Sequence, residues 1–163
     1  MVLLAVTMCA FIGMTISFSI PMSLQAVVEE LLAATDASRC TLRQESEDDF
    51  FPVTHEALAP GAPSIRDERT VDLRTAPVVR QLLSTRRQVV QDDCALAFDD
   101  AGFQRMLAAY GGLAAQVVTP VLVDERLAAI VSLHQLGAPR RWRTEDLELA
   151  RRAAERVRAL IAA

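Results

Sequence analysis

The sequence predicts an α+β fold, with a central antiparallel β-sheet and helices near both ends of the chain. A stretch rich in β-branched residues is interrupted by a polar turn, which is the pattern of a hairpin. Amphipathic helical patterns follow residue 23 and again residue 143. The length of 163 residues suits one domain with a sizeable core.

The first helix begins after Ser23, whose hydroxyl is suited to cap it, and ends at Thr35 and Asp36. Its apolar residues recur at the spacing of a single helical face, at Leu24, Val27, Val28, Leu31 and Leu32. This face is expected to pack on the sheet.

Residues 38–44 alternate in polarity and predict the first strand. Cys40 and Leu42 share one face, which should meet the helices. Thr41 and Arg43 share the other, which should meet a cavity.

Short elements fill the middle of the chain, separated by breaks rich in Gly, Pro and charged residues. Pro77 suits the first turn of a helix, where its missing N–H costs nothing. The expected elements are strands at 50–58 and 89–90 and helices at 78–85 and 101–110; residues 64–75 are expected to be irregular, with a short edge strand at 70–73 as the alternative.

The hairpin joins strands at 116–123 and 127–133 through a polar turn. On its second strand one face is wholly apolar, whereas the other ends in Ser132 and His134. A strand this apolar suggests that both faces are covered, with the polar pair directed into the cavity.

The last helix starts at Thr144, with two acidic residues in its first turn. Its apolar positions form a heptad-like seam at Leu147, Ala150, Ala154, Val157 and Ile161. This seam, together with the stripe on the first helix, predicts a homodimer through the terminal helices.

The series VVTPVLVDERLAAIVSLHQLGAPRRWRTEDLELARRAAERVRALI resembles the end of a GAF domain, and HQLGAPRRW is similar to phytochrome-like members. VVRQLLSTRRQVVQDD resembles the helix and strand before the family's pocket loop. The resemblance covers about residues 23–163. It implies a sensory module with the terminal helices on one sheet face and a ligand pocket on the other. It also implies an output partner, which the sequence does not identify.

The candidate ligand-binding residues are Arg43, Asp93, Tyr110, Ser132 and His134. Arg43 would hold a carboxylate or another small anion. Ser132 and His134 would orient the ligand, Tyr110 would close the pocket and Asp93 would lie at its mouth. Purely structural roles remain open for each.

The cofactor is not identified by the sequence. His134 could coordinate haem iron. In bilin-binding relatives a histidine at this place lies against the chromophore, but those proteins attach the bilin through a cysteine that histidine often follows. Here Ala95 follows Cys94, so bilin attachment is not expected.

Two other functions remain open. Some GAF proteins of this size reduce free methionine sulfoxide with loop cysteines, which would make Cys94 a reactive thiol. Against this, Asp92 and Asp93 should raise its pKa, and Cys40 is expected on the opposite sheet face. The third interpretation is a structural dimerisation module whose pocket is filled by its own side chains. No catalytic triad, phosphate loop or metal-ligand spacing is recognised.

The net charge of −4 argues against nucleic acid as the main partner. The three cysteines show no pairing pattern, which favours a reducing, cytoplasmic location. Residues 1–22 form a separate apolar segment without charge. Three interpretations compete: a membrane anchor, a segment packed on the domain or a partner, and a start site assigned too early with residues 23–163 as the domain.

Overall fold

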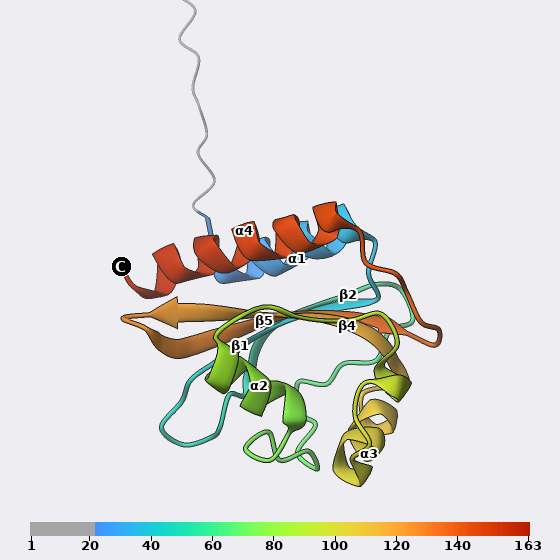
Figure 1. The fold of residues 1–163 in the computed structure, drawn as a ribbon. Helices are drawn as coiled ribbons and strands as arrows, with labels where there is room; N and C mark the ends of the chain where they lie inside the picture. Colours follow the sequence, from blue (N-terminus) through green and yellow to red (C-terminus); the bar gives the residue numbers. More distant parts are fainter. Residues whose placement is uncertain (1–21) are drawn as a thin grey trace, which may run out of the picture.

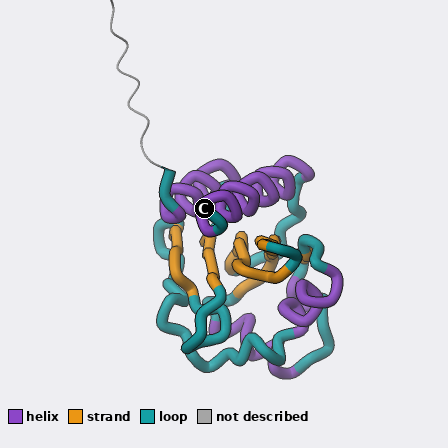
Figure 2. Tube along the Cα trace, turned by 90° about the vertical axis from the view of Figure 1, so that its left-hand side faces the viewer, coloured by secondary structure: helices purple, strands orange, loops and turns teal. Residues whose placement is uncertain are grey.

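The computed structural model describes residues 22–163. Five antiparallel strands form one sheet in the order β2-β1-β5-β4-β3. Helices α1 and α4 cover its upper face, and α2, α3 and irregular segments cover the lower face (Figure 1). The end-on view in Figure 2 shows the same layering. The predicted α+β class and helix placement are confirmed.

The helices and strands occur in nearly the predicted order. Their bounds are α1 Leu24–Thr35, β1 Arg39–Gln44, β2 Val53–Leu58, α2 Pro77–Thr85, β3 Val89–Gln91, the 3₁₀ helix η1 Cys94–Leu96, α3 Ala101–Ala109, β4 Leu113–Val123, β5 Arg126–Leu136 and α4 Thr144–Ile161.

The β4–β5 hairpin occupies the middle of the sheet. Its two-residue turn places Asp124 and Glu125 at φ angles of 50° and 63°, the left-handed region required by a tight hairpin turn. Strand β5 then pairs with β1, which sets Thr41 opposite Ser132 and Arg39 opposite His134. The register therefore brings residues far apart in sequence into one row.

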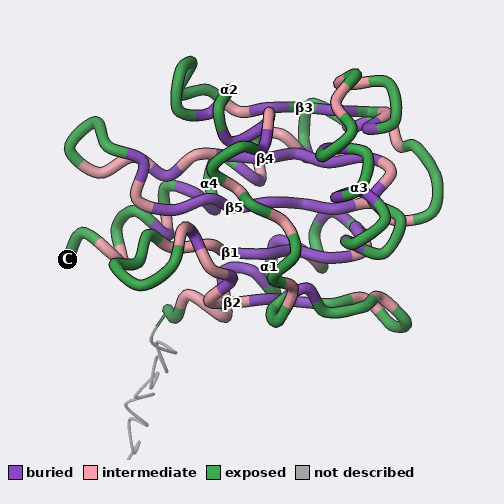
Figure 3. The backbone as a smooth tube through the Cα atoms, turned by 90° about the horizontal axis from the view of Figure 1, so that it is seen from below, coloured by how far each residue is buried: buried purple, intermediate pink, exposed green. Residues whose placement is uncertain are grey.

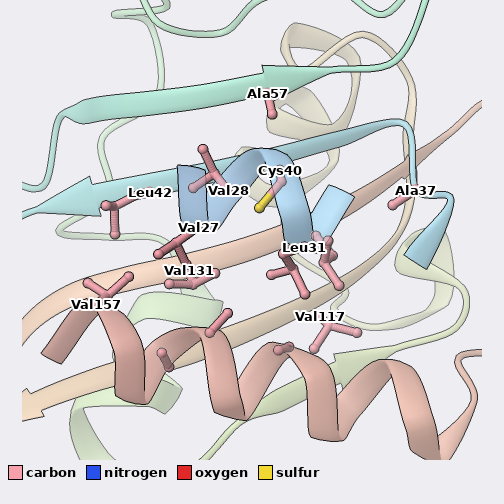
Figure 4. Close-up of a cluster of buried hydrophobic side chains, with 14 of the residues drawn as sticks. Val27, Val28, Leu31, Ala37, Cys40, Leu42, Ala57, Val117, Val131 and Val157 are labelled. Carbon is pink, nitrogen blue, oxygen red and sulfur yellow. The ribbon is translucent and has the colours of Figure 1, made fainter. Parts of the chain in front are cut away.

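The upper core lies between the sheet and helices α1 and α4. Figure 4 shows Val27, Val131 and Val157 directed into this layer, and each is at most 1% exposed. Ala150 and Ala154 belong to the same core. The heptad-like seam of α4 thus packs largely on the protein's own sheet, which explains its pattern without a second chain. The homodimer remains a prediction.

The lower core is a separate cluster beneath the sheet. It joins Phe103 and Met106 of α3 to Leu82 of α2 and Ile130 of β5. Figure 3 views this face, where buried strands are crossed by exposed loops. The lower layer therefore has a less regular covering than the upper layer.

Several predicted boundaries differ from the structure, among them the start of β4 at Leu113, three residues before the predicted position. Strand β2 starts at Val53 and not at residue 50, since Phe51 has a φ angle of 52° and Pro52 lacks an N–H donor. Residues 70–73 form no strand of the described sheet, which agrees with the irregular segment expected there and not with the alternative edge strand. There the Glu68 carboxylate accepts hydrogen bonds from the backbone N–H groups of Thr70 and Val71, which favours a turn.

The predictions for the N-terminal segment fall on residues 1–21, which lie outside the described residues. From Met22 onward, no helix combines the length and apolar character needed to cross a bilayer.

Candidate functional site

A small cavity lies under the middle of the sheet, with a volume of about 40 Å³. Its polar lining residues come from β1, β4, β5 and the end of α3, and they are Arg43, Tyr110, Gln116, Ser132 and His134. Its apolar walls are Leu73, Ala76, Val78, Val79, Met106, Val118 and Ile130. Polar groups thus gather at one end of an otherwise apolar space.

Four of the five predicted site residues line this cavity: Arg43, Tyr110, Ser132 and His134. Asp93 does not, which corrects its expected position at the mouth. Its carboxylate accepts a hydrogen bond from the Ala95 N–H at 3.1 Å and caps η1. Strand β3 ends two residues earlier, so Asp93 belongs to the loop that follows rather than to the sheet.

Arg43 is directed at the cavity wall. Its guanidinium donates to the Phe51 carbonyl at 2.9 Å and to the Tyr110 hydroxyl at 3.0 Å. These bonds leave other N–H groups of the guanidinium for a further acceptor. No ion pair involves Arg43 among residues 22–163, so its charge is not neutralised by a carboxylate contact.

Tyr110 and His134 stack, with ring centroids 6.0 Å apart and an angle of 27° between the planes. Burial raises the pKa of Tyr110, so its hydroxyl keeps its proton at neutral pH. Burial and the charges of Arg39 and Arg43 hold the pKa of His134 well below its ordinary value. The imidazole is therefore neutral at physiological pH.

Arg39 is a further residue at this site that was not recognised from the sequence. Its side chain is fully buried and donates to the His134 ring at Nδ1, at 3.0 Å. Two other donors reach the carbonyls of Pro63 and Tyr110, each at 2.8 Å. Burial lowers the pKa of Arg39 to about 10, so the group remains charged at neutral pH. The alternation that placed Thr41 and Arg43 on the cavity face also places Arg39 there.

One irregular segment, residues 70–76, separates the inner cavity from two outer hollows. A hollow of about 200 Å³ shares Arg43 and Leu73 with the inner cavity. Another, of about 280 Å³, shares Ala76 and Met106 with it. Displacement of this segment would join all three spaces.

Cys94 does not belong to the cavity lining. It is buried, and its thiol donates to the Gln91 side-chain carbonyl with the two atoms 3.6 Å apart. Burial, with a smaller effect of Asp93, raises the pKa of Cys94 to about 12. Cys40 belongs to the upper core, on the other face of the sheet. Within residues 22–163 no cluster of side chains suits a metal ion.

Solved structures of other proteins share this fold. The fold matches GAF3 of Slr1393 from Synechocystis sp. PCC6803 with a TM-score of 0.70 and 20% identity, over 85% of this chain and 90% of that one. It matches the PixJ GAF domain of Thermosynechococcus elongatus with a TM-score of 0.65 and 23% identity, over 84% of this chain and 86% of that one. For a phycocyanobilin-bound GAF domain from a cyanobacterial phytochrome the TM-score is 0.68 and the identity 19%, over 85% of this chain and 82% of that one.

At these identities the structural matches show a shared fold. Among the curated proteins, none matches the chain in sequence. The family model described as GAF domain matches residues 20–161. This match spans all the described helices and strands and agrees with the observed sheet, so the chain belongs to the GAF domain family.

Proposed function

We propose that this GAF domain is a sensor that binds a small molecule in the cavity beneath β4 and β5 and signals through a protein partner. The proposed ligand carries a carboxylate or carbonyl head on a small apolar body. The observation that carries the proposal is the set of hydrogen-bond donors left unused at one end of an apolar cavity.

The donors come from different elements of the fold. Within residues 22–163, Ser132 Oγ and His134 Nε2 have no protein hydrogen-bond partner. Tyr110 accepts from Arg43 and so keeps its own proton to donate. Donors that face a small cavity without protein acceptors are costly unless water or a ligand reaches them, and a ligand oxygen would satisfy several of them at once.

The volume of about 40 Å³ suffices for water, whereas ligand pockets typically reach several hundred Å³. Binding therefore requires residues 70–76 to move aside, which would open the adjoining hollows. Leu73 and Ala76 are the residues of this segment that line the inner cavity. Their movement would admit the apolar body while the head stays on Arg43 and Ser132.

The cysteine chemistry disfavours attachment of a bilin such as the phycocyanobilin of one similar GAF domain. Cys94 is buried, lies outside the lining and is followed by Ala95. The raised pKa of Cys94 also counts against the thiol-reductase interpretation, because the thiolate is the reactive form.

Isothermal titration calorimetry with short carboxylates, amides and alkylammonium ions tests the proposal. Arg43→Ala should weaken carboxylate binding roughly ten- to a hundredfold, because a charge-assisted hydrogen bond contributes about 1.5–3 kcal/mol. Arg126→Ala is the matched control, since this exposed arginine pairs with Glu45 away from the cavity. Equal affinities for the two variants would contradict the site assignment.

Binding should also depend on His134, and its pH dependence follows from its lowered pKa. The neutral ring is the donor at pH 7, so acidification to pH 6 should not strengthen carboxylate binding through His134. His134→Ala should weaken binding at both pH values. A large gain in affinity on acidification that His134→Ala abolishes would identify the imidazolium as the binding form instead.

The proposed partners also include a second copy of the chain. The heptad-like seam of α4 does not by itself require a second chain, because it is largely buried within the domain. Light scattering of the full chain at micromolar concentration distinguishes a dimer from a monomer by mass.

A further inference from the structure

We propose that Arg39 is a positioning residue, which holds His134 as the tautomer with its proton on Nε2. This makes His134 a hydrogen-bond donor towards the cavity and deprives it of a lone pair there. The inference rests on the proposed function for its consequence in ligand selection. The tautomer itself can be tested without any ligand.

The chemistry of the two side chains fixes the direction of their hydrogen bond. Arginine has only donors, so the contact of 3.0 Å between Arg39 Nε and His134 Nδ1 requires Nδ1 to accept. The single proton of a neutral imidazole must then sit on Nε2. Since His134 lines the cavity and Nδ1 is occupied, Nε2–H is the polar group left for a ligand.

Arg39 is held firmly enough to impose this choice. Its guanidinium also donates to the carbonyls of Pro63 and Tyr110, which belong to two segments covering the lower face. All three acceptors are neutral; the charge of Glu56 favours the guanidinium, but within the described chain it forms no ion pair with Arg39. A fully buried cation whose hydrogen-bond acceptors are all neutral is costly, and Glu56 offsets only part of this cost, because burial still lowers the pKa of Arg39.

The surroundings of the ring also oppose a second proton. From β1 it faces the charges of Arg39 and Arg43, and the neutral Tyr110 stacks on it from the end of α3. On β4 its cross-strand neighbour is the uncharged amide Gln116. Among the described residues, no carboxylate pairs with the ring to support an imidazolium.

A consequence for ligand selection follows. A site that presents Nε2–H rather than a lone pair donates to carbonyl and carboxylate oxygens, and it offers no ligand atom to a metal ion. The charges of Arg39 and Arg43 further disfavour cationic ligands. We therefore expect the cavity to favour ligands that carry acceptor groups.

Nitrogen NMR on the full, uniformly ¹⁵N-labelled chain tests the proposal directly. The sequence holds two histidines, so His55→Gln assigns the His134 signals. We expect an Nε2-bound proton, an unprotonated Nδ1, and a scalar coupling across the hydrogen bond from Arg39 Nε to His134 Nδ1. A proton on Nδ1 at pH 7 would overturn the proposal whether or not any variant folds.

Two variants then separate the arginines. Arg39→Met keeps the length of the side chain but removes the donor, so the coupling should vanish and the pKa of His134 should rise. Arg43→Met is the control, because Arg43 does not bond the ring, and it should keep the coupling. An unchanged His134 pKa and proton position in folded Arg39→Met would contradict the role of Arg39.

Titration with sodium acetate and with methylammonium distinguishes this inference from the proposed function. Acetate should shift the His134 Nε2–H resonance, and methylammonium should not. If the Arg39 coupling is present while acetate and larger carboxylates shift nothing, the tautomer assignment is supported and the proposed ligand class fails.

Discussion

The two faces of the sheet are built from the same strands but carry different side chains. On β5, Val131 and Leu133 point upward into an apolar core, whereas Ser132 and His134 point down into the cavity. The upper core is sealed by two long helices, and the lower face by short helices and irregular segments (Figure 1). The comparison shows a regular apolar core above the sheet and, below it, a second core that leaves a small cavity with polar groups.

The lower face also carries the unusual polar groups. Within the described chain, Thr41 Oγ1 and Glu56 Oε1 are buried without a hydrogen-bond partner, and the two residues are direct cross-strand neighbours. Buried orphan groups of this kind destabilise a fold. Their presence on the cavity face, and not among the helices, agrees with the division between the two faces.

The largest effect is expected from a charge placed in the upper core. Val157→Glu puts a carboxylate at a fully buried position, with an expected loss of more than about 4 kcal/mol of unfolding free energy. Ala159→Glu, two residues along α4 and exposed, should change stability by less than about 0.5 kcal/mol. Urea unfolding followed by circular dichroism measures both, and similar midpoints would refute the upper-core assignment.

Adjacent residues on β5 sharpen the comparison. Leu133→Ala removes a fully buried side chain from the upper core and should cost about 2–5 kcal/mol. Ser132→Ala removes a hydroxyl without a protein partner in the described chain and should stay within about 1 kcal/mol. Urea unfolding followed by circular dichroism measures the stability of both variants. A larger loss for Ser132→Ala would mean that the cavity face, too, is built mainly for stability.

A smaller and pH-dependent effect is expected at the start of α4. Burial alone would raise the pKa of Asp146, but hydrogen bonds from Arg143 and the nearby charge of Arg140 bring it below its ordinary value. Such a group stabilises the fold above its unfolded pKa of about 3.9. This contribution to stability is lost as the pH falls from about 4 through the lower pKa that Asp146 has in the folded chain. Asp146→Asn should therefore lose stability at pH 7, and its deficit should shrink below pH 4 in urea titrations.

The smallest effect concerns the thiol of Cys94. With its pKa raised to about 12, alkylation by iodoacetamide at pH 8 should be much slower than for an exposed cysteine with a pKa near 8.5. Cys94→Ser should leave ligand binding unchanged, because the thiol does not line the cavity. Rapid alkylation at pH 8 that peptide mass spectrometry locates at Cys94 of the folded chain would revive the reductase interpretation.

Most of the fold could be predicted from the sequence, because an apolar upper face and a partly polar lower face leave a period of two along β1 and β5. The faces of β1 and β5 were assigned from alternation alone, and the structure places Arg43, Ser132 and His134 together as expected. The role of Arg39 was missed because a fully buried arginine is rare, and residue type alone suggests the surface.

The remaining errors arose where side chains override backbone preference. The alternative edge strand at 70–73 does not form, because the Glu68 carboxylate organises this segment as a turn. Asp93 was assigned to the pocket from its place after β3, whereas its carboxylate caps η1. The heptad-like pattern of α4 suggested a partner chain, although burial on its own sheet produces the same periodicity.

Methyl NMR of the full chain tests the division between the two faces most directly. During titration with short-chain carboxylates and amides, we predict shifts for the cavity methyl groups of Val78, Val118 and Ile130. The upper-core methyl groups of Val28 and Val157 should not move. Shifts confined to the upper core or to the exposed surface, or none with any carbonyl compound, would contradict ligand binding beneath the sheet.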